Sequence, residues 1–544
     1  MKKIYTLILI IVAAQIAKAQ FSIDVSQPMQ VCSSAVSKEN MQTFSAGGNH
    51  YVFWRDKRNG SEFHLYGQRF NSNGVAQWTA NGKLIVAPAV KSVSSYHCSL
   101  FDGGILVSWI QASTSGYGDS VMCKKINFSG NNVWAQPTLL AESLVNSILY
   151  HETYSLNAIP NDSGAFINYS AVFLGGSSAI QFNRIDFNGV KQWSNPKTQS
   201  LPGYTFFTHP GNQNTFYSVS RGNGVGTSIY VQKYNLQSVA QWASPLDVTQ
   251  GVSTNGFGGS HYLFPDNAGN IYMMWQSYGS KIFYTKIDAI GNFVWTPQIK
   301  STVSLASTAQ SNLHALYHNN NLYITWNDNR ITNQATVFTQ KYNSAGVEQW
   351  TTNGVQTGII NGYYGYPKIA VSDSNAIFCT FMMGVPWEVN AQRIRSNGTL
   401  TWASSKVMAN GNAFVNYNNL ITVSDTNGCN AVFWEEFSTE NLFGAKICSN
   451  GNLVKVDNVN GMLNGFEVYP NPASDVVNIQ LSEIMQHENL NVSILNVQGR
   501  EIFKTHVQHT NSRFRINLSD LSPGIYFIKL ETQAHTAIKK LVVQ

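Results

Sequence analysis

Residues 71–78 read NSNGVAQW, a turn residue followed after three positions by Gly and after seven by Trp, and close copies recur along the chain. The copies are NSNGVAQW (71–78), NFSGNNVW (127–134), DFNGVKQW (186–193), NLQSVAQW (235–242), DAIGNFVW (288–295), NSAGVEQW (343–350) and RSNGTLTW (395–402). An eighth, CSNGNLVK (448–455), keeps Gly451 and lacks the Trp. Successive Trp residues lie 49 to 59 positions apart. A regular period of this size is typical of solenoids and propellers.

Each copy is predicted to be a tight β-hairpin. An Asx side chain can bond the backbone two residues on, and a Gly with positive φ closes the turn. A strand such as LYITW (322–326) precedes each hairpin, a further strand lies before that, and a fourth such as KLIVA (83–87) follows. Four antiparallel strands in about 53 residues correspond to one propeller blade.

The ends of the repeat predict how the ring closes. The eighth copy ends near Val459 without a clear fourth strand, whereas QPMQVC (27–32) stands before the first blade where a fourth strand would stand. We therefore expect the N-terminal segment to supply the outer strand of the last blade, which leaves no open sheet edge. The predicted fold is all-β, with an eight-bladed β-propeller over 20–459.

Composition agrees with a folded β protein. Charged residues make up 12% of the chain, about half the usual share, and aromatic residues another 12%. The formal charge is +6, and without the lysines of the first 19 residues 32 basic side chains face 29 acidic ones. Because no Lys/Arg run could neutralise a row of phosphates, nucleic acid is not an expected partner.

The N-terminus has the three parts of a secretory signal. Lys2 and Lys3 precede an apolar stretch, Ile4 to Ala14, and Ala17-Lys18-Ala19 is a small-x-small cleavage site. We predict a signal peptide over 1–19. The apolar stretch is shorter than the roughly 20 residues that span a bilayer, and no later segment is longer, so no membrane span is expected after cleavage.

A second domain is predicted beyond the linker NGMLNG (460–465). Residues 466–544 contain about seven short strands with turn signals between them. This pattern is typical of a small immunoglobulin-like β-sandwich.

The motifs of this segment resemble a known export signal. FEVYPNPASD (466–475), LNVQGRE (495–501), LSPGIYFIKL (521–530) and the terminal KKLVVQ (539–544) are similar to the type A C-terminal sorting domain of type IX secretion substrates. The resemblance implies recognition by that secretion machinery, passage through the periplasm, and a secreted or outer cell-surface location. The matching positions are Pro470, Asn471, Pro472, Gly499, Gly524, Tyr526, Lys539 and Lys540.

The repeat itself resembles two groups of propellers. Its Gly-x-x-x-Trp hairpins resemble the docking motif of eight-bladed quinoprotein propellers, and WRDKR (54–58) and WNDNR (326–330) are similar to repeats of Trp-rich bacterial surface propellers. These resemblances concern architecture, and a fold does not by itself imply a function.

Ligand binding is expected on one face of the ring. The loops between second and third strands differ in every blade, and variable loops on a rigid scaffold are where binding residues concentrate. Exposed aromatic and short polar side chains suit sugar rings or peptides, although Asp and Arg near a turn often bond the backbone or each other. The candidates are Asp56, Arg58, Asp328, Arg330, Tyr363, Tyr364, Trp387, Glu388 and Glu435, with Tyr366 and Glu436 beside them.

No cofactor or metal site is predicted. Three histidines precede a turn Asx by five residues, namely His97, His261 and His314. Because their blades do not converge, packing or hydrogen bonding is favoured over zinc binding. None of the six cysteines forms a C-x-x-C. Cys429 and Cys448 flank one predicted hairpin, and either a disulfide between them or buried thiols would fit.

Three functions are compatible with these features. The favoured hypothesis is a non-catalytic binding or adhesion protein that meets glycan or protein. The second is a secreted polysaccharide-degrading enzyme, a glycosidase or lyase, with its site on the variable-loop face; a glycosidase needs two carboxylates about 5–9 Å apart. The third, a quinone-dependent dehydrogenase, depends on the docking motif alone and ranks last.

Overall fold

The computed structural model describes residues 21–544 with short gaps, in two compact units, Met1–Lys455 and Val456–Gln544. The gaps are 89–90, 113–118, 143–146, 150–155, 162, 174–177, 200, 204, 213, 222–227, 250–256, 278–280, 306–308, 332–333, 361–364, 374–375, 385–386, 412–418, 426–427, 437, 455–465, 482–488, 497–499, 508–512 and 532–535. The predicted signal peptide and the linker at 460–465 lie outside the described residues.

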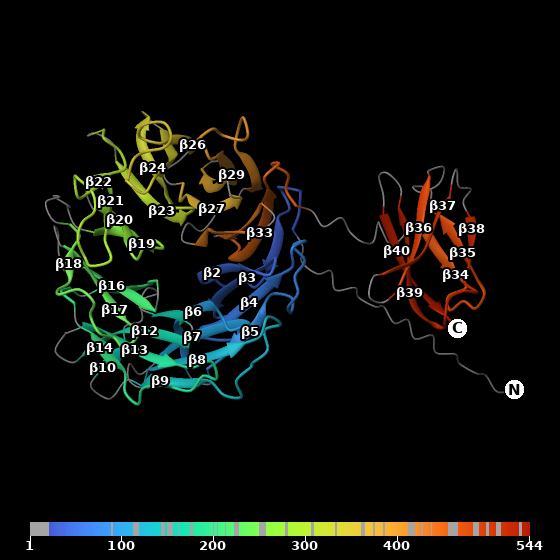
Figure 1. The fold of residues 1–544 in the computed structure, drawn as a ribbon, viewed down its shortest axis with the longest axis horizontal. Helices are drawn as coiled ribbons and strands as arrows, with labels where there is room; N and C mark the ends of the chain where they lie inside the picture. The colour runs from blue at the N-terminus through green and yellow to red at the C-terminus, as the bar shows by residue number, and fades with distance from the viewer. Residues whose placement is uncertain are drawn as a thin grey trace. The chain divides into compact units, whose positions relative to one another are not determined.

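The first unit is an eight-bladed β-propeller, as the sequence predicts. Eight antiparallel sheets follow one another around a ring, and strands such as β2, β6, β19, β23 and β27 lie nearest the centre (Figure 1). In six of the sheets the strand order follows the chain, so these blades are meanders; the third blade has an additional strand and the last includes the N-terminal β1. Within the described ranges, no helix is long and apolar enough to cross a bilayer.

The first four blades contain one four-stranded sheet each, and the third carries one additional strand, β10. Their strands are β2 (Glu39–Ala46), β3 (Asn49–Asp56), β4 (His64–Phe70) and β5 (Lys83–Val86); β6 (Ser92–Phe101), β7 (Gly104–Ala112), β8 (Ser120–Ile126) and β9 (Thr138–Glu142); β10 (Ser147–Leu149), β11 (Leu156–Asn161), β12 (Gly164–Phe173), β13 (Ser178–Ile185) and β14 (Lys197–Gln199); and β15 (Thr205–Pro210), β16 (Thr215–Arg221), β17 (Ile229–Asn235) and β18 (Leu246–Asp247).

The remaining blades follow the same plan. Their strands are β19 (Phe257–Pro265), β20 (Ile271–Ser277), β21 (Ile282–Ile287) and β22 (Lys300–Ser301); β23 (Gln310–His318), β24 (Asn321–Ile331), β25 (Gln334–Tyr342) and β26 (Val355–Ile360); β27 (Lys368–Asp373), β28 (Ala376–Met383), β29 (Trp387–Arg395) and β30 (Lys406–Gly411); and β31 (Ile421–Ser424), β32 (Cys429–Glu436), β33 (Asn441–Cys448) and the N-terminal β1 (Met29–Cys32).

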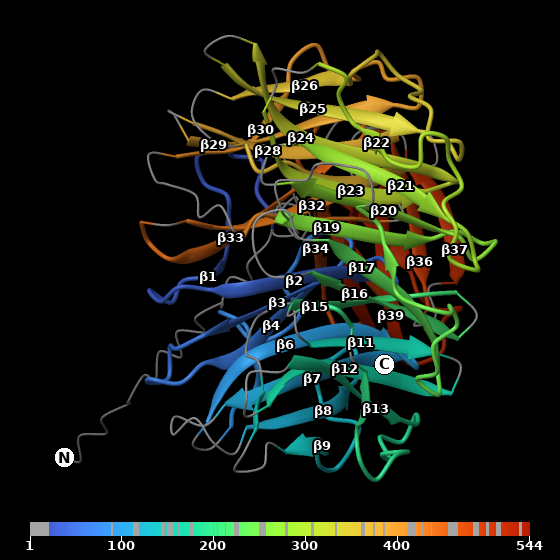
Figure 2. The same cartoon turned by 90° about the vertical axis from the view of Figure 1, so that its left-hand side faces the viewer.

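The predicted ring closure is confirmed. Strand β1 pairs antiparallel with β33, with Met29 opposite Gly444, and the two strands lie side by side in Figure 2. The last blade is therefore built from both ends of the propeller sequence. Because its outer strand comes from the start of the chain, the ring cannot open without breaking a sheet.

Tryptophans join neighbouring blades. Trp78 of the first blade lies against the hairpin glycine of the second, Gly130, and its Nε1 donates to the carbonyl oxygen of Phe128 at 3.3 Å. Equivalent Nε1 bonds of 2.9–3.3 Å run from Trp134 to Phe187, Trp242 to Ala289, Trp295 to Ser344 and Trp350 to Ser396. The repeated Trp thus packs against the following blade, and for five of these residues one hydrogen bond to that blade accompanies the packing.

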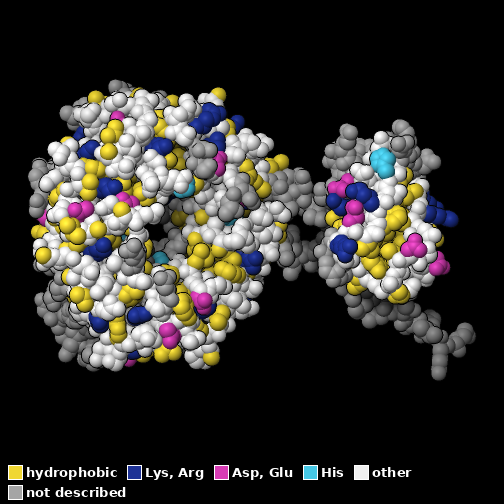
Figure 3. Space-filling view, viewed as in Figure 1, with side chains coloured by type: hydrophobic (Ala, Val, Ile, Leu, Met, Phe, Trp, Pro, Cys, Tyr) yellow, Lys and Arg dark blue, Asp and Glu magenta, His cyan; other side chains and the backbone are white. Residues whose placement is uncertain are grey.

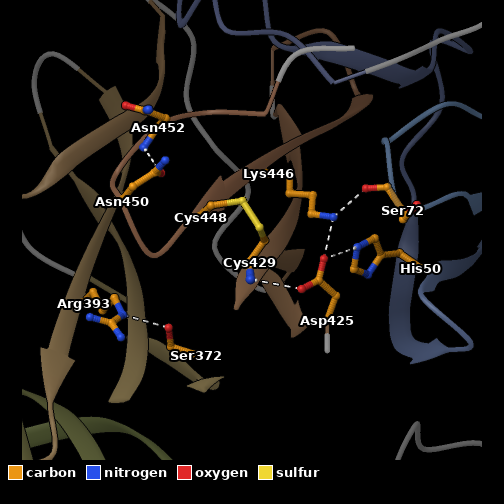
Figure 4. The surroundings of a disulfide bond; sticks show 10 residues. All are labelled: His50, Ser72, Ser372, Arg393, Asp425, Cys429, Lys446, Cys448, Asn450 and Asn452. Atoms are coloured by element: carbon orange, nitrogen blue, oxygen red, sulfur yellow. Dashed lines mark hydrogen bonds and ion pairs between the residues drawn. A yellow bond between two sulfur atoms is a disulfide. The ribbon is translucent and has the colours of Figure 1, made fainter. Parts of the chain in front are cut away.

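The last blade contains a disulfide, and beside it a buried lysine links this blade to the first (Figure 4). Cys429 and Cys448 form a disulfide between β32 and β33, so the disulfide alternative holds for this pair. Beside it, the buried Lys446 Nζ lies 2.6 Å from Asp425 and donates to the Ser72 carbonyl of the first blade at 2.7 Å. The described cysteines outside this pair are buried thiols, namely Cys32, Cys98, Cys123 and Cys379.

The second unit is a two-sheet sandwich, and its seven strands agree with the prediction. One sheet has the order β34-β35-β38 and the other β37-β36-β39-β40. The inward faces bury residues such as Ile479, Val492 and Ile528. The strands are β34 (Phe466–Tyr469), β35 (Val476–Leu481), β36 (Leu490–Leu495), β37 (Glu501–Val507), β38 (Arg513–Asn517), β39 (Gly524–Glu531) and β40 (Thr536–Val543).

Candidate functional site

Asp56 and Arg58 stand where β3 leaves the first blade, and each interacts with the other. The Asp56 carboxylate is fully buried, accepts from Trp54 Nε1 at 3.0 Å and pairs with the Arg58 guanidinium. That guanidinium also donates to the Asn81 carbonyl and lies 3.9 Å from the centre of the Tyr66 ring. The charged groups of Asp56 and Arg58 therefore hold the segment after β3 against its own blade.

Asp328 and Arg330 repeat this arrangement in the sixth blade. Asp328 is buried, accepts from Trp326 Nε1 at 2.9 Å and pairs with Arg330. Arg330 donates to the Asn353 carbonyl at 2.8 Å and covers the Phe338 ring at 3.8 Å. The shared W-x-D-x-R sequence thus forms an Asp–Arg ion pair that fixes the chain locally in each of these two blades. The structure does not bring the two ion pairs together.

Glu435 belongs to a buried junction between the eighth blade and the N-terminal segment. Its carboxylate accepts from the Lys38 backbone at 2.7 Å and from Asn419 Nδ2 at 2.5 Å. Burial raises the pKa of Glu435 and lowers that of Lys38. The Lys38 ammonium donates to backbone carbonyls, among them that of Val36 at 2.6 Å, so this cluster fastens the closing segment.

A cleft lies between the seventh and eighth blades, and it contains part of the predicted site. Trp387, at the start of β29, is partly exposed and lines the cleft with Trp434 and Glu436 from the end of β32. The cleft has a volume of about 180 Å³. Its remaining lining is Ser26, Gln27, Pro28, Val389, Ala409, Asn410 and Phe443.

The cleft combines aromatic walls with polar groups. The rings of Trp434 and Phe443 stack with centroids 6.3 Å apart. The N-terminal segment is held there by the Asn410 backbone, which donates to the Val25 carbonyl at 2.9 Å. Glu388, next to Trp387 in the chain, accepts from Asn390 Nδ2 at 3.1 Å. An aromatic surface flanked by one carboxylate and by amides can stack on a sugar ring and bond its hydroxyls.

Sequence reasoning missed part of this cleft. Gln27 and Pro28 are predicted only as part of the closing segment, and Ser26, Trp434 and Phe443 are not among the predicted site residues. The predicted ring closure could have indicated the N-terminal part of the cleft. If the N-terminal strand joins the last blade, the residues just before that strand must lie at the edge of this blade. Tyr363 and Tyr364 lie outside the described residues, and Tyr366 packs with the hydrophobic core of blades seven and eight.

The histidines form hydrogen bonds between blades. His97 Nδ1 accepts from the Ala158 backbone at 3.3 Å, and His314 Nδ1 accepts from the Ile369 backbone at 3.2 Å. His261 instead meets His209, with the Nε2 atoms 3.0 Å apart. Burial lowers the pKa of all four imidazoles. No set of three or more His, Cys, Asp or Glu side chains suited to a metal occurs among the described residues.

The predicted sorting residues hold the ends of the second unit together. Asn471 accepts from the Val542 backbone at 2.8 Å and donates to the Lys540 carbonyl at 2.7 Å. Lys539 pairs with Glu467 at 2.8 Å. The Tyr526 hydroxyl donates to the Ser522 carbonyl at 2.8 Å, just before β39 begins at Gly524. Pro470 and Pro472 flank Asn471, and Gly499 lies outside the described residues.

A family comparison identifies this unit. Residues 467–544 match the family of secretion system C-terminal sorting domains. The C-terminal unit is a type IX secretion sorting domain. The sorting domain implies an interaction with the type IX machinery and directs the chain to the cell surface or the extracellular space.

Comparisons of the remainder are more distant. No curated protein of matching sequence was found. A protein of unknown function from Dyadobacter fermentans is 12% identical, with 67% of this chain and 96% of that chain covered and a TM-score of 0.35. Prolyl oligopeptidase B from Galerina marginata is 10% identical, with 75% and 56% covered and a TM-score of 0.42. A subtype N10 neuraminidase-like protein of A/little yellow-shouldered bat/Guatemala is 10% identical, with 57% and 97% covered and a TM-score of 0.34.

Proposed function

We propose that this exported propeller is a non-catalytic binding protein that takes a glycan into the cleft between blades seven and eight. The observation that carries the proposal is the cleft itself, in which Trp387 and Trp434 lie beside Glu436. A partly exposed Trp next to short polar groups suits the apolar face and the hydroxyl groups of a sugar ring. The propeller supplies the rigid support that holds these groups in place.

The carboxylates favour binding over hydrolysis. Glu436 is the one carboxylate among the described residues that line the cleft, and it accepts from Thr439 Oγ1 at 2.5 Å. The nearby Glu435 is buried in the junction with Lys38. A glycosidase needs two carboxylates facing one bond about 5–9 Å apart, and this cleft presents one.

Cleavage of the predicted signal peptide would leave the proposed binding cleft intact. Cleavage of the predicted signal peptide after Ala19 would leave Phe21 near the new N-terminus, and Phe21 is buried in the first blade's core cluster. The residues that follow, Ser26–Pro28, line the cleft. Removal of the signal would therefore leave intact the segment that completes both the ring and the cleft.

The test is a glycan array with the full chain, run beside a polysaccharide-hydrolase panel and an extracellular-matrix panel. We expect glycan binding without turnover. Trp387→Ala should weaken the binding affinity at least tenfold, because the stacking that it removes contributes about 1.4 kcal/mol or more. Trp387→Phe keeps an aromatic face and should retain most binding. Phe187→Ala removes a 38% exposed ring from a hairpin and serves as the control.

Three other outcomes of this test would contradict the proposal. Sugar release that is lost in Glu436→Gln would replace the proposal with the glycosidase alternative. Binding confined to the protein panel, or glycan binding unchanged in Trp387→Ala, would also refute a glycan site in this cleft.

A further inference from the structure

The centre of the propeller contains a cavity that is separate from the cleft. Its volume is about 730 Å³, and its lining comes from the inner strands of seven blades. Figure 3 shows the hollow at the centre of the ring, with histidine side chains near its rim. We call this the central cavity; its polar lining includes Gln42, His97, Tyr262, His314 and Lys368.

Lys368 is the one formally charged side chain among the residues that line the central cavity. It is partly buried, and its ammonium has no carboxylate or hydrogen-bond partner among the described residues. Burial lowers its pKa, which is the direction expected for an ammonium whose charge nothing compensates. The buried Lys286 is compensated by contrast, since its Nζ lies 3.1 Å from Asp266.

The two histidines that line the central cavity each retain one ring nitrogen that can donate a hydrogen bond. Nδ1 of His97 and of His314 each accepts a backbone N–H, so a neutral ring must carry its proton on Nε2. Burial lowers the pKa of both rings, which favours the neutral form. No described residue accepts from either Nε2. Each ring therefore has one N–H available, while Nδ1 fixes its orientation.

Lys368 and His314 lie next to each other in the cavity wall. The backbone N–H that His314 accepts belongs to Ile369, the residue after Lys368, so the two side chains project from adjacent inner strands at one level. The Tyr262 ring packs on His314 at 5.3 Å between centroids. An ammonium and an imidazole N–H at one place, with no acid in the lining, form a positively polarised site.

From this geometry we infer that the central cavity binds a small oxyanion, such as the carboxylate of an acidic sugar or a sulfate or phosphate group, between Lys368 Nζ and the Nε2–H of His314. The anion would supply the countercharge that the protein lacks and would accept from both donors. The volume of the cavity is ample for a monosaccharide acid, and its aromatic and aliphatic lining suits the uncharged part of such a ligand.

The test is calorimetric titration of the full chain at low ionic strength with glucuronate, sulfate and phosphate, and with glucose as the uncharged match for glucuronate. We expect saturable binding of at least one anion and none of glucose. Lys368→Met should weaken binding at least tenfold, whereas Lys368→Arg, which keeps the charge, should stay within threefold of the wild type. Lys504→Met removes a 62% exposed lysine of the other unit and should change nothing.

The three anions distinguish a carboxylate site from a site for sulfate or phosphate. Equal anion binding by the wild type and Lys368→Met, equal binding of glucuronate and glucose, or no saturable binding of any anion would overturn the inference. Because removal of an uncompensated charge should not destabilise the fold, Lys368→Met is expected to keep the wild-type Tm. The inference is independent of the glycan cleft: Trp387→Ala should keep anion binding, and Lys368→Met should keep glycan binding.

Discussion

Phe21 lies against Gly74 so closely that a Cβ built on this glycine would come within 1.9 Å of Phe21 Cδ2. The Phe21 backbone N–H also donates to the Gly74 carbonyl at 3.2 Å. Every later hairpin glycine, from Gly130 to Gly451, meets a Trp of the preceding blade instead. The eighth repeat has no Trp, so Phe21 fills the place of the missing ring at the junction where the propeller closes.

Truncation of Phe21 should therefore loosen the closure of the ring. Phe21 is 1% exposed and stacks on Phe70 at 5.5 Å, and we expect Phe21→Ala to lower the free energy of unfolding by about 3–5 kcal/mol. All 13 Trp residues precede β33, so Trp fluorescence in a urea titration reports on the propeller. Ile23→Ala, at a 52% exposed position, is the control, and an equal effect of both changes would contradict this role.

Two glycines with the same φ make it possible to measure the cost of the left-handed backbone separately from the cost of crowding a Trp. Gly103 and Gly346 both have φ of +69°, but a Cβ at Gly103 meets nothing within 4 Å, whereas at Gly346 it would lie 2.9 Å from Trp295. Gly103→Ala should cost about 1 kcal/mol for the left-handed backbone. Gly346→Ala should cost about 2–4 kcal/mol, because crowding of the Trp adds to that strain. Similar losses in urea unfolding would show that the Trp contact contributes little.

The buried histidines predict acid sensitivity. Burial lowers the pKa of His50, His97 and His209 to about 4, below the value of about 6.5 in an unfolded chain. Their contribution to stability is fully present above pH 6.5 and is lost as the pH falls toward 4, because only the unfolded chain takes up protons there. We expect a loss of several kcal/mol between pH 7 and pH 4.5 in fluorescence-monitored unfolding.

Replacement of one such ring should reduce that loss. Gln42, in the first blade, already accepts a backbone N–H of the next blade with its Oε1, as His97 does with its imidazole. His97→Gln should keep this bond and flatten the pH dependence below 6.5. His506→Gln changes an exposed imidazole of the sandwich and should leave the propeller transition as it is. An unaltered slope in His97→Gln would show that this site does not govern acid unfolding.

The disulfide of the last blade should stabilise the closed ring. Cys429 and Cys448 are separated by 19 residues, and a crosslink over a loop of this length stabilises a fold by about 3 kcal/mol in the chain-entropy description. We expect a fall in Tm when both residues are replaced by Ser, and a similar fall when the wild type is reduced. Cys123→Ser alters a buried thiol outside this bond, so its Tm should still fall on reduction as in the wild type, whereas the double Ser variant should be insensitive to reductant.

Removal of residues 466–544 should stop export beyond the periplasm, because the type IX machinery recognises this unit. Cell fractionation with an antibody to the propeller measures the outcome, and a folded periplasmic propeller is expected. Unchanged delivery of the truncated chain to the surface would contradict the assignment. Asn471→Ala is the finer variant, since it removes both bonds that Asn471 makes to β40.

Much of the fold could be predicted because its signals are local and repeated. Each Asx-to-Gly turn is decided by residues within one hairpin, as where Asn71 accepts the Val75 backbone N–H at 2.9 Å. Eight such hairpins at a steady period, five of them with both the Asx and the Gly, specify the blades. An unpaired strand at each end specifies the closure. The seven strands of the sandwich were readable for the same reason, from turn signals between short apolar segments.

The candidate site could be predicted only in part, because its members are assembled by closure of the ring. The sequence predicted variable loops for the W-x-D-x-R segments and for Glu435. The structure instead places Asp56, Asp328 and Glu435 near the ends of β3, β24 and β32, with their carboxylates buried. Only the tertiary structure placed Pro28 in one cleft with Trp387 and Trp434, which lie 359 and 406 positions away in the chain. The physical reason is that hairpin geometry depends on neighbours in sequence, whereas desolvation and ion pairing depend on neighbours in space.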